Sequence, residues 1–96
     1  MPTLLLAEDD RVVLFTLADG LREAGFEVIE ARDGARALEL CKSELPDLAL
    51  LDIRMPGLDG LELARRLRAE TSTPFLFFTA YDDEDLVRRA VKLGAL

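Results

Sequence analysis

Two acidic positions follow directly on hydrophobic runs, where a buried strand would deliver a side chain to a ligand. Asp52 follows residues 48–51, and Glu8 and Asp9 follow residues 3–7. Carboxylates that meet at one edge of a sheet raise one another's pKa values unless a cation neutralises them. Mg²⁺ suits a site that offers few protein oxygens and several waters. With Mg²⁺ bound, an aspartate such as Asp52 can act as a nucleophile toward phosphorus and form an acyl phosphate.

Three further residues belong to this group of candidates. Thr79 ends the hydrophobic run at residues 75–78, so we expect its hydroxyl in the same crevice. Ala80 beside it is small enough to leave the entrance open. Arg54 lies in the tight turn after Asp52, where its backbone carbonyl is a candidate metal ligand.

Each candidate also has an ordinary structural explanation. Glu8 and Asp9 could cap the helix that follows them, and Asp52 could be a turn or capping aspartate. Thr79 could be only a β-branched strand residue, and Pro56-Gly57 a plain turn. Taken singly, these explanations are preferable. Because the residues fall together at the ends of three strands, the functional interpretation is favoured.

Alternating strand and helix patterns must bring these residues together. Short hydrophobic stretches at residues 3–7, 26–30, 48–52 and 75–79 predict strands, and each is followed by a helical pattern. Such alternation is typical of an α/β fold with a parallel sheet and helices on both faces. The simplest topology is the open flavodoxin-like order 2-1-3-4-5, present here as 2-1-3-4. In that order the first and third strands are neighbours, so Asp9 and Asp52 meet at one crevice.

The spacing of apolar residues predicts which face of each helix is buried. The helix after the first strand is expected to end at Gly25 and to have a wide apolar stripe that needs two neighbours. The second helix is expected to start at Asp33-Gly34 and end at Pro46, and a fourth to start at Asp82 or Asp83 and stop at Gly94. The expected inward residues are Val13, Leu17, Leu21 and Ala24, with Val12, Leu14 and Phe15 at the sides, and then Ala37, Leu38, Cys41 and Leu45.

Composition excludes several classes of function. The net charge is −7, with 19 acidic against 12 basic residues, which argues against direct nucleic-acid binding. The chain has no histidine, so neither histidine acid–base catalysis nor a histidine-ligated zinc is available. Apolar runs are too short to span a membrane, and the start of the chain does not resemble a signal peptide. The single Cys41 is expected to be a packing residue. We therefore expect a cytoplasmic protein.

Three segments in this order and spacing resemble the receiver domain of response regulators in two-component signalling. The resemblance covers the whole chain and implies a flavodoxin-like fold and a signalling switch rather than an enzyme. It implies a sensor histidine kinase or a phosphotransfer protein as partner, and Mg²⁺ as the cofactor. The segments are Leu6-Ala7-Glu8-Asp9-Asp10, Leu51-Asp52-Ile53-Arg54-Met55-Pro56-Gly57-Leu58-Asp59-Gly60 and Phe78-Thr79-Ala80.

The resemblance also assigns a role to each site residue. Asp52 would be the phosphoacceptor and Asp9 a direct Mg²⁺ ligand. Glu8 would hold the metal through water, in a position where many members have aspartate. The carbonyl of Arg54 would complete the protein ligands, and Thr79 would contact the phosphoryl group and shift on activation.

The chain departs from the family pattern at its C-terminal end. Receiver domains have a fifth strand followed by a lysine that pairs with the phosphoryl group. This chain has only Lys42 and Lys92, both in predicted helices, so residues 1–96 are expected to form a C-terminally incomplete receiver domain. Without a fifth β–α unit, the fourth strand is an edge and the first helix lacks a neighbour. We expect either a homodimer through the exposed fourth-strand edge and first-helix face, or a longer parent chain.

Two other functions remain open from the sequence. One is a Mg²⁺-dependent phosphohydrolase that uses an aspartyl phosphate, although that class places its nucleophile in an Asp-x-Asp pattern on the first strand. Here the first strand is followed by Glu8-Asp9-Asp10. The other is a pseudo-receiver that binds partners without phosphate, which the missing lysine keeps open.

Overall fold

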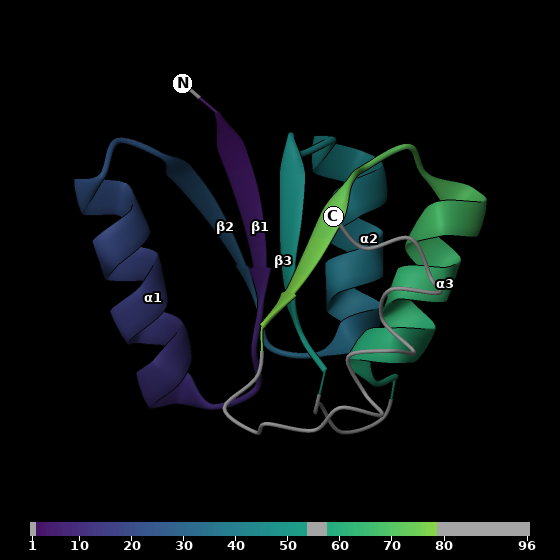
Figure 1. Cartoon of the computed structure of the whole chain (residues 1–96), viewed down its shortest axis with the longest axis horizontal. Helices are drawn as coiled ribbons and strands as arrows, with labels where there is room; N and C mark the ends of the chain where they lie inside the picture. The colour runs from purple at the N-terminus through teal and green to yellow at the C-terminus, as the bar shows by residue number, and fades with distance from the viewer. Residues whose placement is uncertain (1, 54–57, 79–96) are drawn as a thin grey trace.

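Four parallel strands form one sheet in the order β2-β1-β3-β4 in the computed structural model (Figure 1), which describes residues 2–53 and 58–78. The order is the predicted one. Leu5 on β1 aligns with Ile29 on β2 and with Ala49 on β3. The predicted fourth helix lies outside the described residues. The elements are β1 (Thr3–Ala7), α1 (Arg11–Glu23), β2 (Glu27–Ala31), α2 (Gly34–Glu44), β3 (Leu48–Asp52), α3 (Gly60–Glu70) and β4 (Phe75–Phe78).

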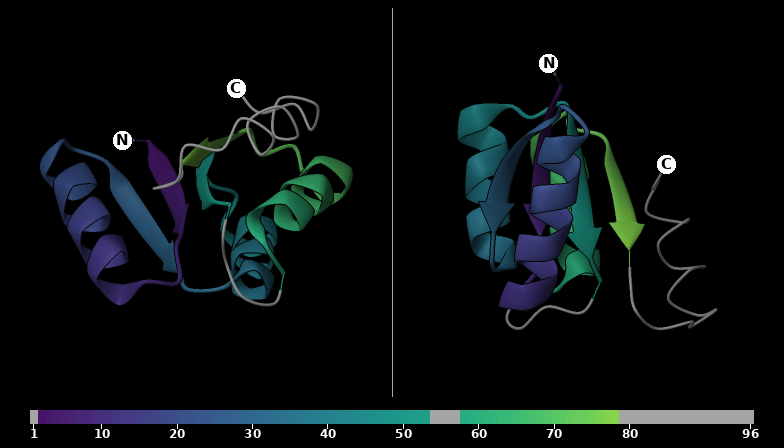
Figure 2. Two further views of the ribbon diagram at one scale, coloured as in Figure 1. Left: turned by 60° about the horizontal axis from the view of Figure 1, so that its bottom comes forward. Right: turned by 90° about the vertical axis from the view of Figure 1, so that its left-hand side faces the viewer.

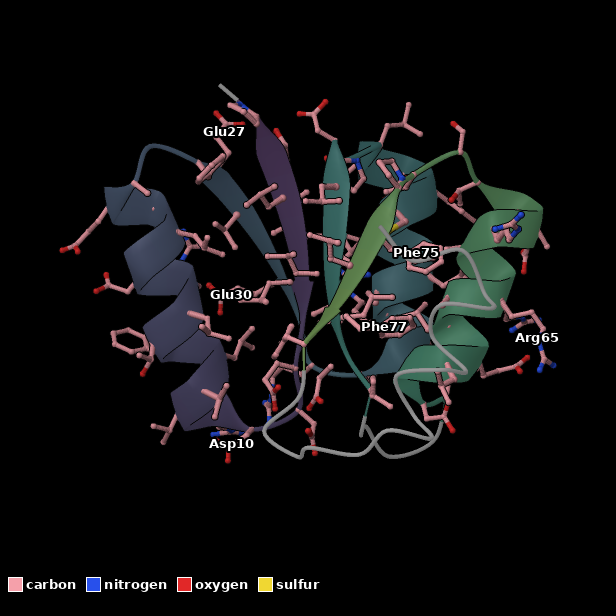
Figure 3. The ribbon with its side chains drawn as sticks, in the orientation of Figure 1. Asp10, Glu27, Glu30, Arg65, Phe75 and Phe77 are labelled. Atoms are coloured by element: carbon pink, nitrogen blue, oxygen red, sulfur yellow. The ribbon has the colours of Figure 1, made fainter. Side chains whose placement is uncertain are left out.

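Helices cover the sheet unequally on its two faces. Helix α1 lies on one face, and α2 and α3 lie together on the other (Figures 1 and 2). Because strand residues alternate in direction, Leu5 packs with α2 and α3, whereas Leu6 packs with α1. On β4, Phe75 and Phe77 lie on the α3 side (Figure 3), with ring centroids 5.7 Å apart in an edge-on arrangement. The larger core is therefore the one beneath α2 and α3.

An aspartate caps the start of each described helix. The carboxylate of Asp10 accepts hydrogen bonds from the backbone N–H groups of Val12 (2.9 Å) and Val13 (3.2 Å). Asp33 accepts from the N–H of Arg36 and so caps α2, as predicted. Asp59 caps α3 in the same way. Each cap directs the chain from the carboxyl end of a strand back over the sheet.

The inward face of α1 is displaced by one residue from the prediction over the first half of the helix, whereas Leu21 packs against the core as predicted. Leu14 and Ala18 are buried against the sheet, whereas Val13 and Leu17 are 39% and 37% exposed. The apolar stripe of α1 is wide enough to allow either phase, and contact with β1 and β2 selects this one. The second neighbour expected over α1 is not found among the described residues, and Phe15 is 70% exposed.

One other prediction of burial was wrong. Leu45 does not belong to the buried face of α2, because it follows the helix in a left-handed conformation (φ 49°) and is 74% exposed. Strand β4 is fully buried only at Phe75, since it is the outermost strand of the described sheet. Strand β2 is outermost on the other side. Over the described residues, no helix is both long and apolar enough to cross a membrane.

Candidate functional site

Three carboxylates meet where β1 and β3 end. The two strands are parallel neighbours, with Ala7 in register with Leu51, so the residues that follow leave the sheet side by side. Glu8, Asp9 and Asp52 each place one carboxylate oxygen within 4.8 Å of the others. Glu8 is only 4% exposed and Asp52 9%, whereas Asp9 is half-buried. Asp9 and Asp52 therefore meet at the carboxyl ends of β1 and β3, as the strand order predicts.

The described surroundings of Glu8 disfavour its charged form. The pKa of Glu8 is raised to about 7, mainly by burial and also by a side-chain hydrogen bond with Asp52 and by the charges of Asp52 and Asp9. A hydrogen bond to Glu8 from the backbone N–H of Asp10 (3.0 Å) acts in the opposite direction on this pKa without cancelling the rise. Without a cation, Glu8 is therefore about half protonated at pH 7, and its protonated form shares a hydrogen bond with Asp52.

The capping explanation for the acidic residues applies to Asp10. Asp10 supplies the carboxylate that caps α1, and Figure 3 places it where β1 gives way to that helix. Glu8 supports this turn by accepting the Asp10 N–H. The carboxylates of Glu8 and Asp9 do not cap α1, and they lie with Asp52 in the cluster. This arrangement distinguishes a structural acid from the three that face one another.

Gly60, the first residue of α3, packs against the backbone of Asp52 and Ile53. The N–H of Gly60 donates to the carbonyl of Ile53 (3.0 Å). A Cβ atom at position 60 would lie 2.2 Å from the carbonyl oxygen of Asp52, much closer than two atoms can approach. From the sequence, Gly60 is only part of a motif, because its need to lack a side chain depends on how the start of α3 packs on the end of β3.

Three predicted site residues, Arg54, Thr79 and Ala80, lie outside the described residues, so their roles stay predictions. Lys92, which was not predicted to belong to the site, lies outside them as well. Lys42 is described, and it lies in the last turn of α2, where it forms an ion pair with Glu70 of α3. Helix α2 runs away from the carboxyl ends of the strands, so Lys42 lies toward their amino ends. It therefore does not take the place of the lysine that pairs with the phosphoryl group in receiver domains.

The donor set fits a hard divalent cation. All three side chains of the cluster present oxygen, and the described residues around it contribute no sulfur or imidazole. The raised pKa of Glu8 shows that the third carboxylate is costly to ionise without added positive charge. Glu8, Asp9 and Asp52 could therefore hold Mg²⁺ in a site completed by water.

Comparison with known proteins gives consistent matches. The family model for the response regulator receiver domain matches residues 4–96. The transcriptional regulatory protein PdtaR of Mycobacterium tuberculosis is 40% identical over 93 residues, covering 96% of this chain and 45% of that protein. The sporulation initiation phosphotransferase F of Bacillus subtilis is 31% identical over 94 residues, covering 97% of this chain and 76% of that protein.

Solved structures agree with the sequence matches. The signal receiver domain of the response regulator NarL of Mycobacterium tuberculosis superposes with a TM-score of 0.92 at 39% identity. The match covers 98% of this chain and 78% of that domain. The chain thus spans about half the length of PdtaR and about four fifths of a solved receiver domain.

Proposed function

The chain belongs to the response regulator receiver domain family, and from this premise we propose that it is a phosphoacceptor switch whose acceptor is Asp52. Receiver domains act as signalling switches that exchange phosphoryl groups with histidine kinases or phosphotransfer proteins. The observation that carries the assignment is the cluster of Glu8, Asp9 and Asp52 at the carboxyl ends of β1 and β3. Of the three, only Asp52 is itself the last residue of a strand, whereas Glu8 and Asp9 follow the end of β1.

The same cluster supports a Mg²⁺ site. We assign Asp9 and Asp52 as direct ligands, the Arg54 carbonyl as the third protein ligand, and Glu8 as a ligand through water. The buried carboxylates and the raised pKa of Glu8 favour this assignment, because a cation would relieve their repulsion. When bound, Mg²⁺ would neutralise negative charge on the phosphoryl oxygens during transfer.

In the proposed transfer, a carboxylate oxygen of Asp52 attacks the phosphorus of a phosphohistidine on the partner. A P–O bond forms on Asp52 while the P–N bond breaks, and the imidazole nitrogen leaves with the electron pair and is protonated by solvent. The protein contributes to this transfer mainly by positioning the Asp52 carboxylate and the phosphoryl group relative to each other. Thr79 is assigned to contact the phosphoryl group, and the small Ala80 to leave its approach open.

The partners follow from the family and from charge. We propose a sensor histidine kinase or phosphotransfer protein as the phosphodonor in the cytoplasm. The net charge of −7 opposes direct nucleic-acid binding by these residues. The transcriptional regulator that matches is longer than this chain, so its regulatory output is not assigned to these residues.

Phosphorylation in vitro tests the proposal. The chain is incubated with acetyl phosphate and Mg²⁺, and its intact mass is measured. We expect one added phosphoryl group, which is lost when Mg²⁺ is chelated and lost in Asp52→Asn. The matched control is Asp10→Asn, which keeps a capping side chain beside the site and should still be labelled.

The same experiment separates the other two functions. A pseudo-receiver would take up no phosphoryl group under any condition. A phosphohydrolase would turn over acetyl phosphate through a residue on the first strand, so that Asp52→Asn would retain its label. Either result would overturn Asp52 as acceptor.

A further inference from the structure

Helix α2 begins with a glycine that has no room for a side chain. A Cβ atom on Gly34 would lie 2.1 Å from the carbonyl oxygen of Leu58 and 2.9 Å from its Cβ. Among the described glycines only Gly25 has a positive φ, of 101°, so Gly34 is required by space and not by backbone conformation. The first residue of α2 thus rests directly on the segment that leads into α3.

This contact is one of a series of backbone and side-chain contacts that surrounds the acidic cluster. The N–H of Glu8 donates to the carbonyl of Ala31 (3.0 Å), at the end of β2. The chain then reaches Gly34, which touches Leu58, and two residues later Gly60 packs on the backbone of Asp52. The series ends where the carboxyl groups of Asp52 and Glu8 meet.

We propose that Gly34 is a positioning residue for the acidic cluster, setting through Leu58 and the start of α3 where the Asp52 carboxylate lies relative to Glu8 and Asp9. This inference rests on the proposed phosphoacceptor function. It adds a residue of a different helix, α2, that touches Leu58 just before α3 begins.

The size of the overlap explains why a side chain at position 34 would displace the acidic cluster. An alanine Cβ at position 34 meets backbone atoms, so no side chain can turn aside to make room. To restore an ordinary contact distance, Leu58 must move by roughly an ångström or more. Because Gly60 follows Leu58 closely and abuts Asp52, that movement is passed to the phosphoacceptor. Metal and phosphoryl sites are sensitive to displacements of this size.

The test is the Mg²⁺ affinity of the folded protein, followed by amide chemical shifts in an NMR titration. Gly34→Ala should weaken Mg²⁺ binding about tenfold or more, as is typical when support behind metal ligands is lost. Gly20→Ala is the matched control, because a Cβ at that position of α1 has nothing within 4 Å. Leu67→Ala is the second control, since it damages the core at the far end of α3. Both controls should bind within about twofold of wild type, because neither shares a contact with the site.

Each outcome has a definite meaning. Equal Mg²⁺ affinity in Gly34→Ala and wild type would overturn this inference and leave the proposed function intact. The same holds if Leu67→Ala weakens binding as much as Gly34→Ala, because the loss would then reflect general loosening. A wild-type chain that neither binds Mg²⁺ nor takes up phosphate would overturn the proposed function, and this inference with it. If Gly34→Ala does not fold, the wild-type titration decides: Mg²⁺ should shift the amide resonances of Gly34 and Leu58 together with that of Asp52, and unchanged resonances at Gly34 and Leu58 would overturn the inference.

Discussion

Replacing Glu8 by glutamine should stabilise the metal-free protein, and increasingly so as the pH rises. The pKa of Glu8 is raised from 4.5 to about 7 in the folded protein. Between these values the native state holds a proton that the unfolded chain has already released, so the free energy of unfolding of wild type falls as the pH increases. The full loss is about 3 kcal/mol, of which about 2.5 kcal/mol falls between pH 5 and pH 8.5.

Glutamine removes this loss and keeps the local hydrogen bonds. Its carbonyl oxygen can still accept the Asp10 N–H, and its amide can donate to Asp52 in place of the carboxyl proton. Urea unfolding is measured at about pH 5 and pH 8.5 with a chelator present. The stability advantage of Glu8→Gln over wild type should grow by about 2.5 kcal/mol across this interval. The chain has no histidine to obscure the comparison.

An exposed acid provides the control. Glu23→Gln, near the end of α1, should follow the pH dependence of wild type. Adding Mg²⁺ at pH 8.5 should stabilise wild type more than Glu8→Gln, because only the wild-type residue gains from neutralisation. Parallel pH profiles for wild type and Glu8→Gln would refute the view that Glu8 is buried against ionised neighbours.

Three other predictions concern the scaffold. Gly25→Ala should lower the free energy of unfolding by about 1 kcal/mol in urea denaturation, because Gly25 has φ 101°; no loss would contradict this geometry. Leu45→Gly should raise it by up to about 1 kcal/mol, since Leu45 is exposed in a left-handed conformation, and a loss would show that its side chain packs. The exposed Val12 and Phe15 on α1, with β4 outermost in the described sheet, should draw two copies of the chain together. Sedimentation should therefore show a dimer that Phe15→Glu shifts toward monomer, and a monomeric wild type at high concentration would contradict the expected association.

The strand order and the meeting of the acidic residues could be predicted because both depend on local patterns. Hydrophobic runs fix the strands, and parallel strands must bring Asp9 and Asp52 to one edge. The phase of α1 could not be predicted in the same way. Val13 and Leu14 are both apolar, and only contact with β1 and β2 determines which of them is buried.

Close contacts between the backbones of packed elements could not be predicted from the sequence either. Gly34 was predicted only as a helix-start residue and Gly60 only as part of a motif, and their importance comes from carbonyl groups that packing brings within reach. Likewise, clustering predicted raised pKa values for the acids in general. The burial of Glu8, which only the structure shows, identifies this residue as the acid whose pKa is raised to about 7.

The most direct measurement is the position of the phosphoryl group itself. After treatment with acetyl phosphate and Mg²⁺, borohydride reduction converts an aspartyl phosphate to homoserine, which tandem mass spectrometry can locate in the sequence. We expect homoserine at position 52 alone, and none when Mg²⁺ is chelated. A reduced residue at Glu8, Asp9 or Asp10, with Asp52 unchanged, would contradict the assignment of Asp52 as the phosphoacceptor.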